Sequence, residues 1–547
     1  MFVFQIINIF IKYTFMGIPS YFSYIVKNHK RLLKQFIPKE IKIDNLYIDS
    51  NSLIYDSLFS IISEYSDNES FEKKLISMVN EQLENHICEI NPSKNVIIAF
   101  DGIAPFAKLE QQRTRRYKSQ FLESTSTIIN PDKEKTPWNK SAITPGTVFM
   151  NKLNSEVGKY FRNKSRKLGV KNIIFSGSDE IGEGEHKIFE FIRENAEMHK
   201  HQTTVIHGLD ADLIMLCLNH LHISDNIYLY RETPHYIKNI SAELDPDNTY
   251  LVDIFELGKD IVEDLNNGRE VDKQQKYNSI HDYIFICFML GNDFLPHFPS
   301  VNIRTNGIDI LVNTYKHVLG DSNENLTYNA KIKWKNLRKF VSYLSETEID
   351  NLRSEYKIRD RIEKRELPKN TIEEKERYFN MLPTKEREIE KYINPFEYGW
   401  QQRYYKMLFD LEINDNRRQE ICTNYLEGLE WNLAYYTNGC KNWEWKYCYN
   451  YPPLWQDLIK YVPYFDTTFV KEGVENTIST AVQLAYVLPR NSLELLPFKT
   501  RQKLLLEYND VYRLDYKFRW SFCKYFWESH IDMPDLNIDK LKEIVST

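Results

Sequence analysis

Cysteine is scarce in this chain of 547 residues. The seven that occur are scattered, at positions 88, 217, 287, 422, 440, 448 and 523, with no CxxC pair and no spacing typical of a zinc site. This absence excludes a disulfide framework and a structural zinc site, and it favours free thiols in a reducing compartment. Because a basic nuclear-localisation cluster is also absent, we expect a cytoplasmic protein.

Long apolar runs are absent too, apart from the opening MFVFQIINIFIKYTF. This stretch is interrupted by Lys12, is short for a membrane span, and lacks the basic region and the cleavage site of a signal peptide. We therefore expect a soluble protein without a membrane partner. Residues 1–15 are interpreted as an extension, and Met16, which opens MGIPSYFSYI, as the functional boundary.

An excess of positive charge is likewise missing. The chain has 71 Lys and Arg against 77 Asp and Glu, a net charge of −6. This excludes a global electrostatic attraction to nucleic acid, so any nucleic-acid site must be a local basic patch. The length exceeds that of one simple hydrophobic core and predicts two regions or one elaborated α/β domain.

Short β-rich apolar runs recur in the first half of the chain, separated by segments with helical periodicity such as 71–87 and 186–199. The runs are NLYIDSN (45–51), NVIIAFDG (95–102), KNIIFSG (171–177) and TTVIHGLDAD (203–212). Strands that alternate with helices predict an α/β fold with a mostly parallel central sheet. Ligands bind such sheets beyond the carboxyl ends of the strands, where the acids of these runs lie.

The rest of the chain divides by composition. About half of residues 346–391 are charged, with both signs mixed, which we interpret as a solvated helical or partly disordered connector. It separates an α/β nuclease core (16–345) from a C-terminal region (392–547) that is rich in aromatic residues and is expected to be helical, to pack on the core and to complete the active site.

Seven acidic residues stand at strand ends or in loops whose context is unlike ordinary surface. They are Asp49, Asp101, Glu183, Glu185, Asp210, Asp212 and Asp293. Burying so many carboxylates together is unfavourable without cations. Because oxygen ligands suit Mg²⁺ or Mn²⁺, the set predicts two such ions, which can activate a water and stabilise the leaving oxygen in phosphodiester hydrolysis.

Each acid alone has a structural alternative, because an Asp after a strand is usually a helix N-cap. Caps explain the acids one by one but give no reason for their repetition, so we favour a metal site. Glycines in GEGE (182–185) permit a close approach of the backbone to metal or phosphate.

Several segments together resemble the signature blocks of XRN-type 5′→3′ exoribonucleases, in family order. They are MGIPSYFSYI (16–25), NLYIDSNSLIYD (45–56), IIAFDGIAPFAKLEQQRTRRYKSQ (97–120), ITPGTVFM (143–150), FSGSDEIGEGEHKIFEFIR (175–193), GLDADLIML (208–216), FICFMLGNDFLPHFPS (285–300), LEGLEWNLAYYTNG (426–439) and AYVLPRNSLELLP (485–497). The resemblance implies a PIN/flap-nuclease-like core, a catalytic set of all seven acids, and stepwise hydrolysis of single-stranded RNA that carries a 5′-monophosphate. We expect a monomer that degrades RNA, including mRNA.

The segment KLEQQRTRRYK (108–118) predicts the site for the terminal phosphate. Lys108, Gln112, Arg115 and Arg116 recur at near-helical spacing, so one helix face presents three cations and an amide. In the resembling family the matching residues form the 5′-monophosphate pocket. The alternative is a solvated basic face, and Arg113 points elsewhere on the helix.

Single-stranded substrates are usually held by aromatic stacking. Tyr55 stands where the family has a stacking His, and Trp431 matches a family Trp, so we expect these two side chains to stack on the bases. The alternative for Trp431 is a core tryptophan on an amphipathic helix. Phe106 replaces the usual Arg of the family, which puts one backbone contact in doubt.

Two other classes remain as alternatives. A flap-type DNA endonuclease shares the acidic core, but the segment after GNDFLP, HFPSVNIRTNGIDILVNTYK (297–316), has no helix–hairpin–helix for duplex DNA. An inactive RNA-binding scaffold would keep the fold without turnover, and the complete set of acids argues against it.

Overall fold

The computed structural model describes residues 18–546 except 19, 30, 38–39, 133–137, 232–243, 246–247 and 474–477. The expected extension at residues 1–15 and the boundary at Met16 lie outside the described residues. Within the described part of the chain, no helix combines the length and the apolar character needed to span a membrane.

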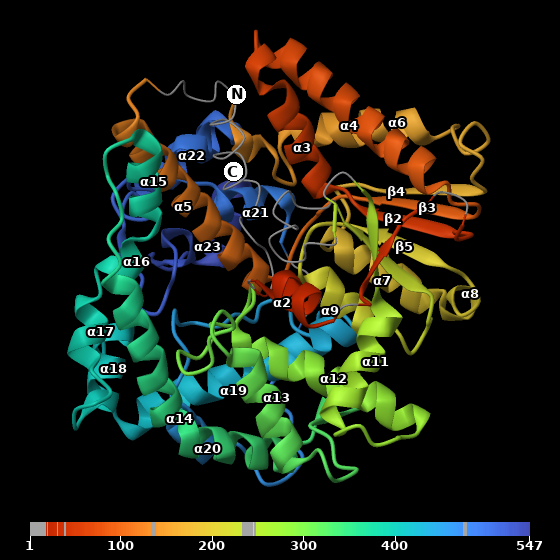
Figure 1. Ribbon diagram of the computed structural model, residues 1–547. Coiled ribbons are helices and arrows are strands. Elements are labelled where there is room, and N and C mark those ends of the chain that lie inside the picture. The colour runs from red at the N-terminus through yellow and green to blue at the C-terminus, as the bar shows by residue number, and fades with distance from the viewer. Residues whose placement is uncertain are drawn as a thin grey trace.

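A seven-stranded sheet forms the centre of the first half of the chain (Figure 1). Its strand order is β1-β7-β6-β5-β2-β3-β4, in which β2 to β6 run parallel while β7 and β1 are antiparallel additions at one edge. The strands are β1 Leu33–Gln35, β2 Asn45–Asp49, β3 Asn95–Ala99, β4 Asn172–Ser176, β5 Thr204–His207, β6 Ile227–Arg231 and β7 Tyr250–Asp253. The mostly parallel central sheet predicted from the alternating runs is confirmed.

A row of asparagines fixes the register at the amino ends of three parallel strands. Asn45, Asn95 and Asn172 are paired with one another across β2, β3 and β4. The side-chain amide of Asn95 donates to Asn45 Oδ1 at 2.8 Å, and that of Asn172 donates to Asn95 Oδ1 at 3.0 Å. A slip of one residue would break these bonds and exchange the residues that face the two sides of the sheet, so the acids at the opposite ends keep a fixed alignment.

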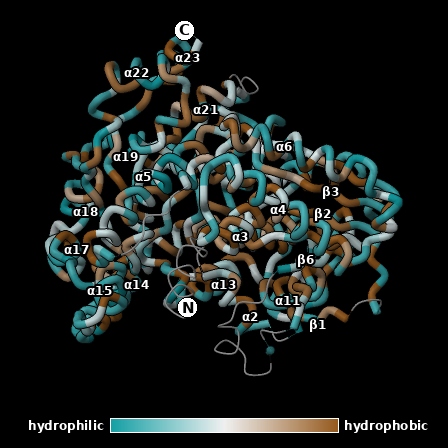
Figure 2. Tube along the Cα trace, turned by 90° about the horizontal axis from the view of Figure 1, so that it is seen from above, coloured by the Kyte–Doolittle hydropathy of each residue, from teal (hydrophilic) through white to brown (hydrophobic). Residues whose placement is uncertain are grey.

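Helices cover both faces of the sheet. Leu46, Ile48, Val96 and Ile98 face one apolar cluster beneath α3, α4 and α6, whereas Tyr47 and the residues that alternate with this set face a second cluster beneath α7, α9, α11 and α12. Figure 2 shows hydrophobic residues along β2 and β3, inside the molecule. The helices of this half are α2 Tyr21–Asn28, α3 Asn51–Ile61, α4 Asn68–Ile90, α5 Phe106–Ile129, α6 Val148–Phe161, α7 Gly184–Glu194, α8 Ala196–His199, α9 Asp212–Asn219, α11 Ile254–Leu265, α12 Lys273–Cys287 and α13 Gly307–Val318.

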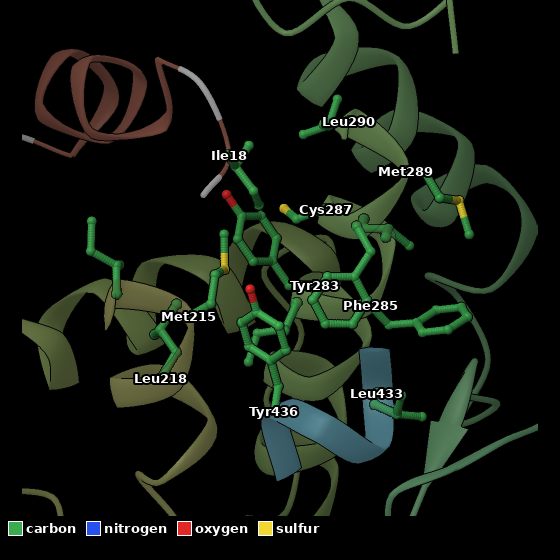
Figure 3. Close-up of a cluster of buried hydrophobic side chains, with 14 of the residues drawn as sticks. Ile18, Met215, Leu218, Tyr283, Phe285, Cys287, Met289, Leu290, Leu433 and Tyr436 are labelled. Atoms are coloured by element: carbon green, nitrogen blue, oxygen red, sulfur yellow. The ribbon is translucent and has the colours of Figure 1, made fainter. Parts of the chain in front are cut away.

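The second half is mainly helical and packs against the first. Its helices are α14 Trp334–Glu363, α15 Ile372–Asn380, α16 Leu382–Lys385, α17 Glu388–Ile393, α18 Trp400–Phe409, α19 Asp415–Thr437, α20 Trp455–Tyr461, α21 Thr480–Val487, α22 Phe498–Glu507 and α23 Ile538–Ser546, with short strand pairs β8 Thr327–Tyr328 with β9 Lys331–Ile332 and β10 Lys517–Arg519 with β11 His530–Asp532. Short 3₁₀ helices include η3 Phe288–Leu290 and η5 Phe526–Glu528. Leu433 and Tyr436 of α19 pack into the large cluster around α9 and α12, beside Met215, Tyr283 and Phe285 (Figure 3).

Residues 346–391 are mainly helical, which was one of the two expected forms, but part of their charge is buried and paired instead of solvated. The helix α14 runs without a break across residue 345, and α15 to α17 fold back beside it. Arg359 donates to both carboxylate oxygens of Glu390, at 2.9 and 2.7 Å, and Arg387 donates to Glu390 at 2.6 Å; these three side chains are buried. The charge composition of this segment could not predict the burial of these side chains, because a charged residue looks the same in the sequence whether it is paired in the interior or exposed to solvent.

Candidate active site

The ends of three parallel strands bring the first acids together. Asp49 is the last residue of β2, Asp101 follows β3 and Asp210 follows β5. These strands are neighbours in the sheet, in the order β5-β2-β3, so their carboxyl ends meet at one edge. Electrostatic interactions link Asp49 to both Asp101 and Asp210. The expectation that these acids would converge beyond the strand ends agrees with their placement.

Helix starts and one loop supply the remaining four acids. Glu183 and Glu185 flank the first residue of α7, Asp212 begins α9, and Asp293 follows η3. The backbone N–H of Asp212 donates to Asp210 Oδ1 at 3.1 Å, which holds the two carboxylates of the DAD segment side by side. Glu183, Glu185 and Asp212 are buried. Electrostatic interactions also link these four acids to one another and to the strand-end acids, so the seven predicted acids form one cluster.

Gly184 allows α7 to approach the strand ends. A Cβ at this position would lie 2.7 Å from Asp49 Oδ1 and 3.2 Å from the Ala99 carbonyl oxygen. The Gly184 N–H donates to Asp101 Oδ1 at 2.8 Å. Any side chain here would therefore force the helix away from the acids, which explains the glycine between Glu183 and Glu185.

Burial and mutual repulsion raise the pKa values of most acids in this cluster. Burial, reinforced by neighbouring carboxylates, raises the pKa values of Asp49, Glu185 and Asp212 well above their ordinary range. Burial and the charge of Asp293 raise the pKa of Asp210 to about 7. Burial also raises the pKa of Glu183, against the opposing effect of Lys108. A bound cation would relieve this cost.

Lys108 lies among the acids, although the sequence placed it in the phosphate pocket. Its Nζ is 2.6 Å from Glu183 Oε2 and 2.9 Å from Asp293 Oδ2. Burial alone would lower the pKa of Lys108, but Asp293 and Glu183 raise it well above its ordinary value. Lys108 is therefore a buried counter-ion of the carboxylates in this structure.

The donor atoms fit hard divalent cations. In the described residues, Asp49 Oδ1, Glu185 Oε2 and Asp212 Oδ1 are buried carboxylate oxygens without a hydrogen-bond partner. Such oxygens suit Mg²⁺ or Mn²⁺. With Lys108 between Glu183 and Asp293, no three His, Cys, Asp or Glu side chains of the described segments are spaced to hold an ion together. Binding therefore requires side-chain rearrangement around Lys108.

A large cavity begins at the acids and continues along α5. It has a volume of about 1310 Å³ and is lined by Asp49, Asp101, Glu183, Glu185 and Asp210 at one end. Lys108, Gln112, Arg115 and Arg116 line the same cavity, so the structure brings all four predicted phosphate-binding residues to its wall. Burial lowers the pKa of Arg116 to about 10, which leaves it charged at neutral pH.

Two other residues of α5 face away from this wall. Arg113 is buried, donates to the Pro534 carbonyl oxygen at 2.8 Å, and lies over the Tyr486 ring. Phe106 also packs edge-on against Tyr486, at 5.6 Å between ring centroids. Arg113 thus points away from the cavity, as its position on the helix predicted. Phe106 packs the start of α5 against the C-terminal half.

The two predicted stacking residues have different surroundings. Tyr55 lines the cavity from α3. Trp431 is not among the described residues that line this cavity, and its side chain is fully buried. Its ring stacks on Tyr435 and Trp445, with centroids 4.7 and 5.0 Å apart, and its indole N–H donates to the Asn442 carbonyl oxygen. This placement matches the alternative of a core tryptophan.

The cavity instead has an aromatic pair that the sequence reasoning missed. Tyr525 and Trp527, which flank Phe526 of η5, both line it, and their rings stack at 5.7 Å with an angle of 13°. Lys118 of α5 donates to the Trp527 carbonyl oxygen at 2.8 Å, so the pair is fastened to the helix that carries Arg115. The signal available was the pattern Lys-Tyr-Phe-Trp at 524–527, in which aromatic side chains alternate beside a cation.

Comparison with known proteins identifies the family of this chain. Residues 16–233 match the family described as XRN 5′-3′ exonuclease N-terminus, and residues 274–392 and 380–546 match the Xrn1 helical domain. The chain is 25% identical to 5′-3′ exoribonuclease 2 of Gallus gallus, over 96% of this chain and 69% of that protein. It is 26% identical to 5′-3′ exoribonuclease 1 of Saccharomyces cerevisiae, over 88% of this chain and 40% of that protein, and 28% identical to the 5′-3′ exoribonuclease 2 homolog of Drosophila melanogaster, over 92% and 65%. Both halves of the chain are matched in order, and the chain belongs to the XRN 5′-3′ exonuclease family.

Proposed function

We propose that this chain is a 5′→3′ exoribonuclease that hydrolyses single-stranded RNA with a 5′-monophosphate, releasing one nucleoside 5′-monophosphate at a time. The observation that carries the proposal is one cavity that holds the acid cluster at its end and Arg115 and Arg116 on its wall. A cation beside the hydrolytic site favours a chain end with an extra phosphate, because charge-assisted bonds to phosphate are strong.

The acids supply the hydrolytic half of the site. Their unpartnered oxygens and their raised pKa values favour binding of two divalent cations, Mg²⁺ or Mn²⁺. The predicted ligands are Asp49, Asp101, Glu183, Glu185, Asp210, Asp212 and Asp293. When bound, such cations activate a water and neutralise the charge that develops on the leaving oxygen.

The α5 wall supplies the end selection. Gln112, Arg115 and Arg116 bind the terminal phosphate, which sets the distance from the chain end to the scissile bond. Tyr55 on one wall and Trp527 on another hold the first bases by stacking, which is tolerant of sequence. This assignment uses Trp527 in place of Trp431, because only the former lines the cavity within the described residues.

The environment expected for the enzyme is reducing. All seven cysteines are free thiols, and Cys217, Cys287, Cys422 and Cys523 are buried. This supports a reducing compartment for the enzyme, such as the expected cytoplasm.

A turnover assay tests the proposal. RNA with a 5′-monophosphate, the same RNA with a 5′-hydroxyl, and a DNA flap are each incubated with the protein, with and without Mg²⁺. We expect mononucleotides from the phosphorylated RNA only when Mg²⁺ is present. Release of an oligonucleotide from the flap, with RNA left intact, would instead assign a structure-specific endonuclease.

A further inference from the structure

Helix α19 of the C-terminal half turns three polar side chains toward the acids. Asn432, Tyr435 and Tyr436 have the spacing i, i+3, i+4, which places them on one helix face. All three are buried. None is an acid, so the search for carboxylates did not identify them.

The two tyrosines reach two different acid-bearing segments. The Tyr435 hydroxyl donates to Glu183 Oε1 at 2.5 Å, while Lys108 holds the other oxygen of that carboxylate. The Tyr436 hydroxyl lies close enough to the carboxylate of Asp212 to lower the pKa of that acid. One helix thus contacts the start of α7 and the start of α9.

Asn432 reaches the third segment. Its Oδ1 accepts a bond of 2.7 Å from the side-chain amide of Asn292, the residue before Asp293. Asn292 Oδ1 in turn accepts the backbone N–H groups of Phe294 and Leu295, at 3.0 and 2.9 Å. The loop that carries Asp293 is therefore closed around a side chain that α19 holds.

Packing behind this face fixes the tyrosine rings. The Tyr435 ring stacks on Trp431 at 4.7 Å and lies 3.8 Å from the ring of His186, the neighbour of Glu185. The Tyr436 ring lies 4.9 Å from Phe288 of η3, and Figure 3 shows it inside the core cluster. These rings have little freedom to move.

We infer that Asn432, Tyr435 and Tyr436 are positioning residues that hold Glu183, Asp212 and the Asp293 loop in the arrangement that binds the divalent cations. Trp431 supports this face by stacking on Tyr435. The C-terminal half thereby acts on the metal site of the N-terminal half without contributing a metal ligand of its own. The inference rests on the proposed function, because it concerns the same acids.

These contacts matter because a cation site needs its carboxylates in fixed orientations. Carboxylates that repel one another turn apart unless hydrogen bonds fix their orientation. Partners that orient metal ligands typically change metal affinity or activity by about 10–100-fold when they are removed. A phenol suits this task because it donates one bond and stays neutral, since burial raises the pKa values of Tyr435 and Tyr436 well above 10.0.

The test removes single hydroxyl groups and measures metal binding without RNA. Tyr435→Phe, Tyr436→Phe and the double variant keep the rings and their packing. Mn²⁺ binding is followed by electron paramagnetic resonance on the full chain, and kcat and KM are measured on phosphorylated RNA. We expect Mn²⁺ affinity to fall by about tenfold in each variant and kcat to fall with it, while KM for RNA stays near that of the wild type.

Tyr404→Phe is the control, because Tyr404 is a buried tyrosine of the C-terminal half whose hydroxyl donates to the Pro452 carbonyl oxygen and contacts none of the seven acids. Wild-type Mn²⁺ affinity in the double variant would overturn the inference. So would a loss of affinity that Tyr404→Phe reproduces, since this would reflect general loosening of the C-terminal half. If the wild type itself neither binds Mn²⁺ nor cleaves RNA, the proposed function fails as well, and the two failures are thus distinct.

Discussion

The Nζ atom of Lys108 lies 2.6 Å from Oε2 of Glu183. This contact links α5, which carries Arg115 and Arg116, to the start of α7. This contact gives Lys108 a position among the acids, in addition to its predicted place on the phosphate-binding wall of the cavity. With Asp293 at 2.9 Å on its other side, the ammonium group is held inside the acid cluster. The phosphate wall and the metal site therefore share one residue, and a change in either one acts on the other.

Replacing Lys108 tests this shared position. Lys108→Met leaves the acids without their buried cation, and breaking a buried ion pair typically costs about 3–5 kcal/mol. We expect the free energy of unfolding without metal to fall by that order, and saturating Mg²⁺ to restore part of the loss. Lys159→Met, which removes an exposed pair with Glu156, is the control, with an expected change below about 1 kcal/mol. Equal effects of the two variants would show that Lys108 is not a counter-ion.

Asp210 predicts a pH dependence of stability. Its folded pKa is raised from 3.8 to about 7, so between these values the unfolded chain has released a proton that the folded chain retains. The free energy of unfolding therefore falls as pH rises from about 4 to about 7. Asp210→Asn carries no such proton, so without metal its Tm relative to the wild type should increase from about pH 5 to about pH 8. Thermal unfolding in EDTA measures the two Tm values at each pH. A Tm difference between variant and wild type that stays constant across this range would contradict the raised pKa of Asp210.

Arg115 and Arg116 should distinguish the two kinds of RNA end. A charge-assisted contact to a terminal phosphate is worth roughly 1.5–3 kcal/mol. Either Arg→Ala change should therefore slow cleavage of 5′-monophosphate RNA about tenfold or more, and barely change that of 5′-hydroxyl RNA. Arg162→Ala, at an exposed position beyond α6, is the control in single-turnover measurements. Equal losses on both ends would mean that these arginines grip the internal backbone instead.

Replacing Trp527 should weaken RNA binding, whereas replacing Trp431 should lower stability. Because Trp527 lines the cavity, Trp527→Ala should weaken RNA binding by about 1–3 kcal/mol per lost base stack and leave Tm nearly unchanged. Trp431 is buried in the core, so Trp431→Ala should lower the free energy of unfolding by about 3–5 kcal/mol. Fluorescence anisotropy with a non-cleavable RNA and denaturant unfolding measure the two effects. The reverse pattern would restore Trp431 as the stacking residue.

The sequence was most informative where local rules decide position. Asp49, Asp101 and Asp210 stand at the ends of short apolar runs whose β-branched residues are typical of strands. Because parallel strands end at a common edge, their convergence follows from the pattern. Arg115 and Arg116 share a helix face for the same reason of periodicity. These features need no knowledge of distant contacts.

Features that depend on tertiary packing were less accessible. Trp431 and Trp527 both lie in aromatic segments, and only the docking of η5 against α5 decides which of them faces the cavity. Arg359 and Glu390 read as solvated charge because their pairing spans 31 residues. Tyr435 was overlooked because a search for acids does not include the groups that orient them.

The most direct test of the account is the first product released from phosphorylated RNA. With a radioactive 5′-phosphate on single-stranded RNA and Mg²⁺, the account predicts labelled nucleoside monophosphate as the first product, without labelled oligonucleotides. Glu183→Gln should abolish that product while RNA binding persists, because affinity rests mainly on phosphate and stacking contacts. Labelled fragments longer than one nucleotide, or near-normal turnover by Glu183→Gln, would contradict end-directed hydrolysis at the acid cluster.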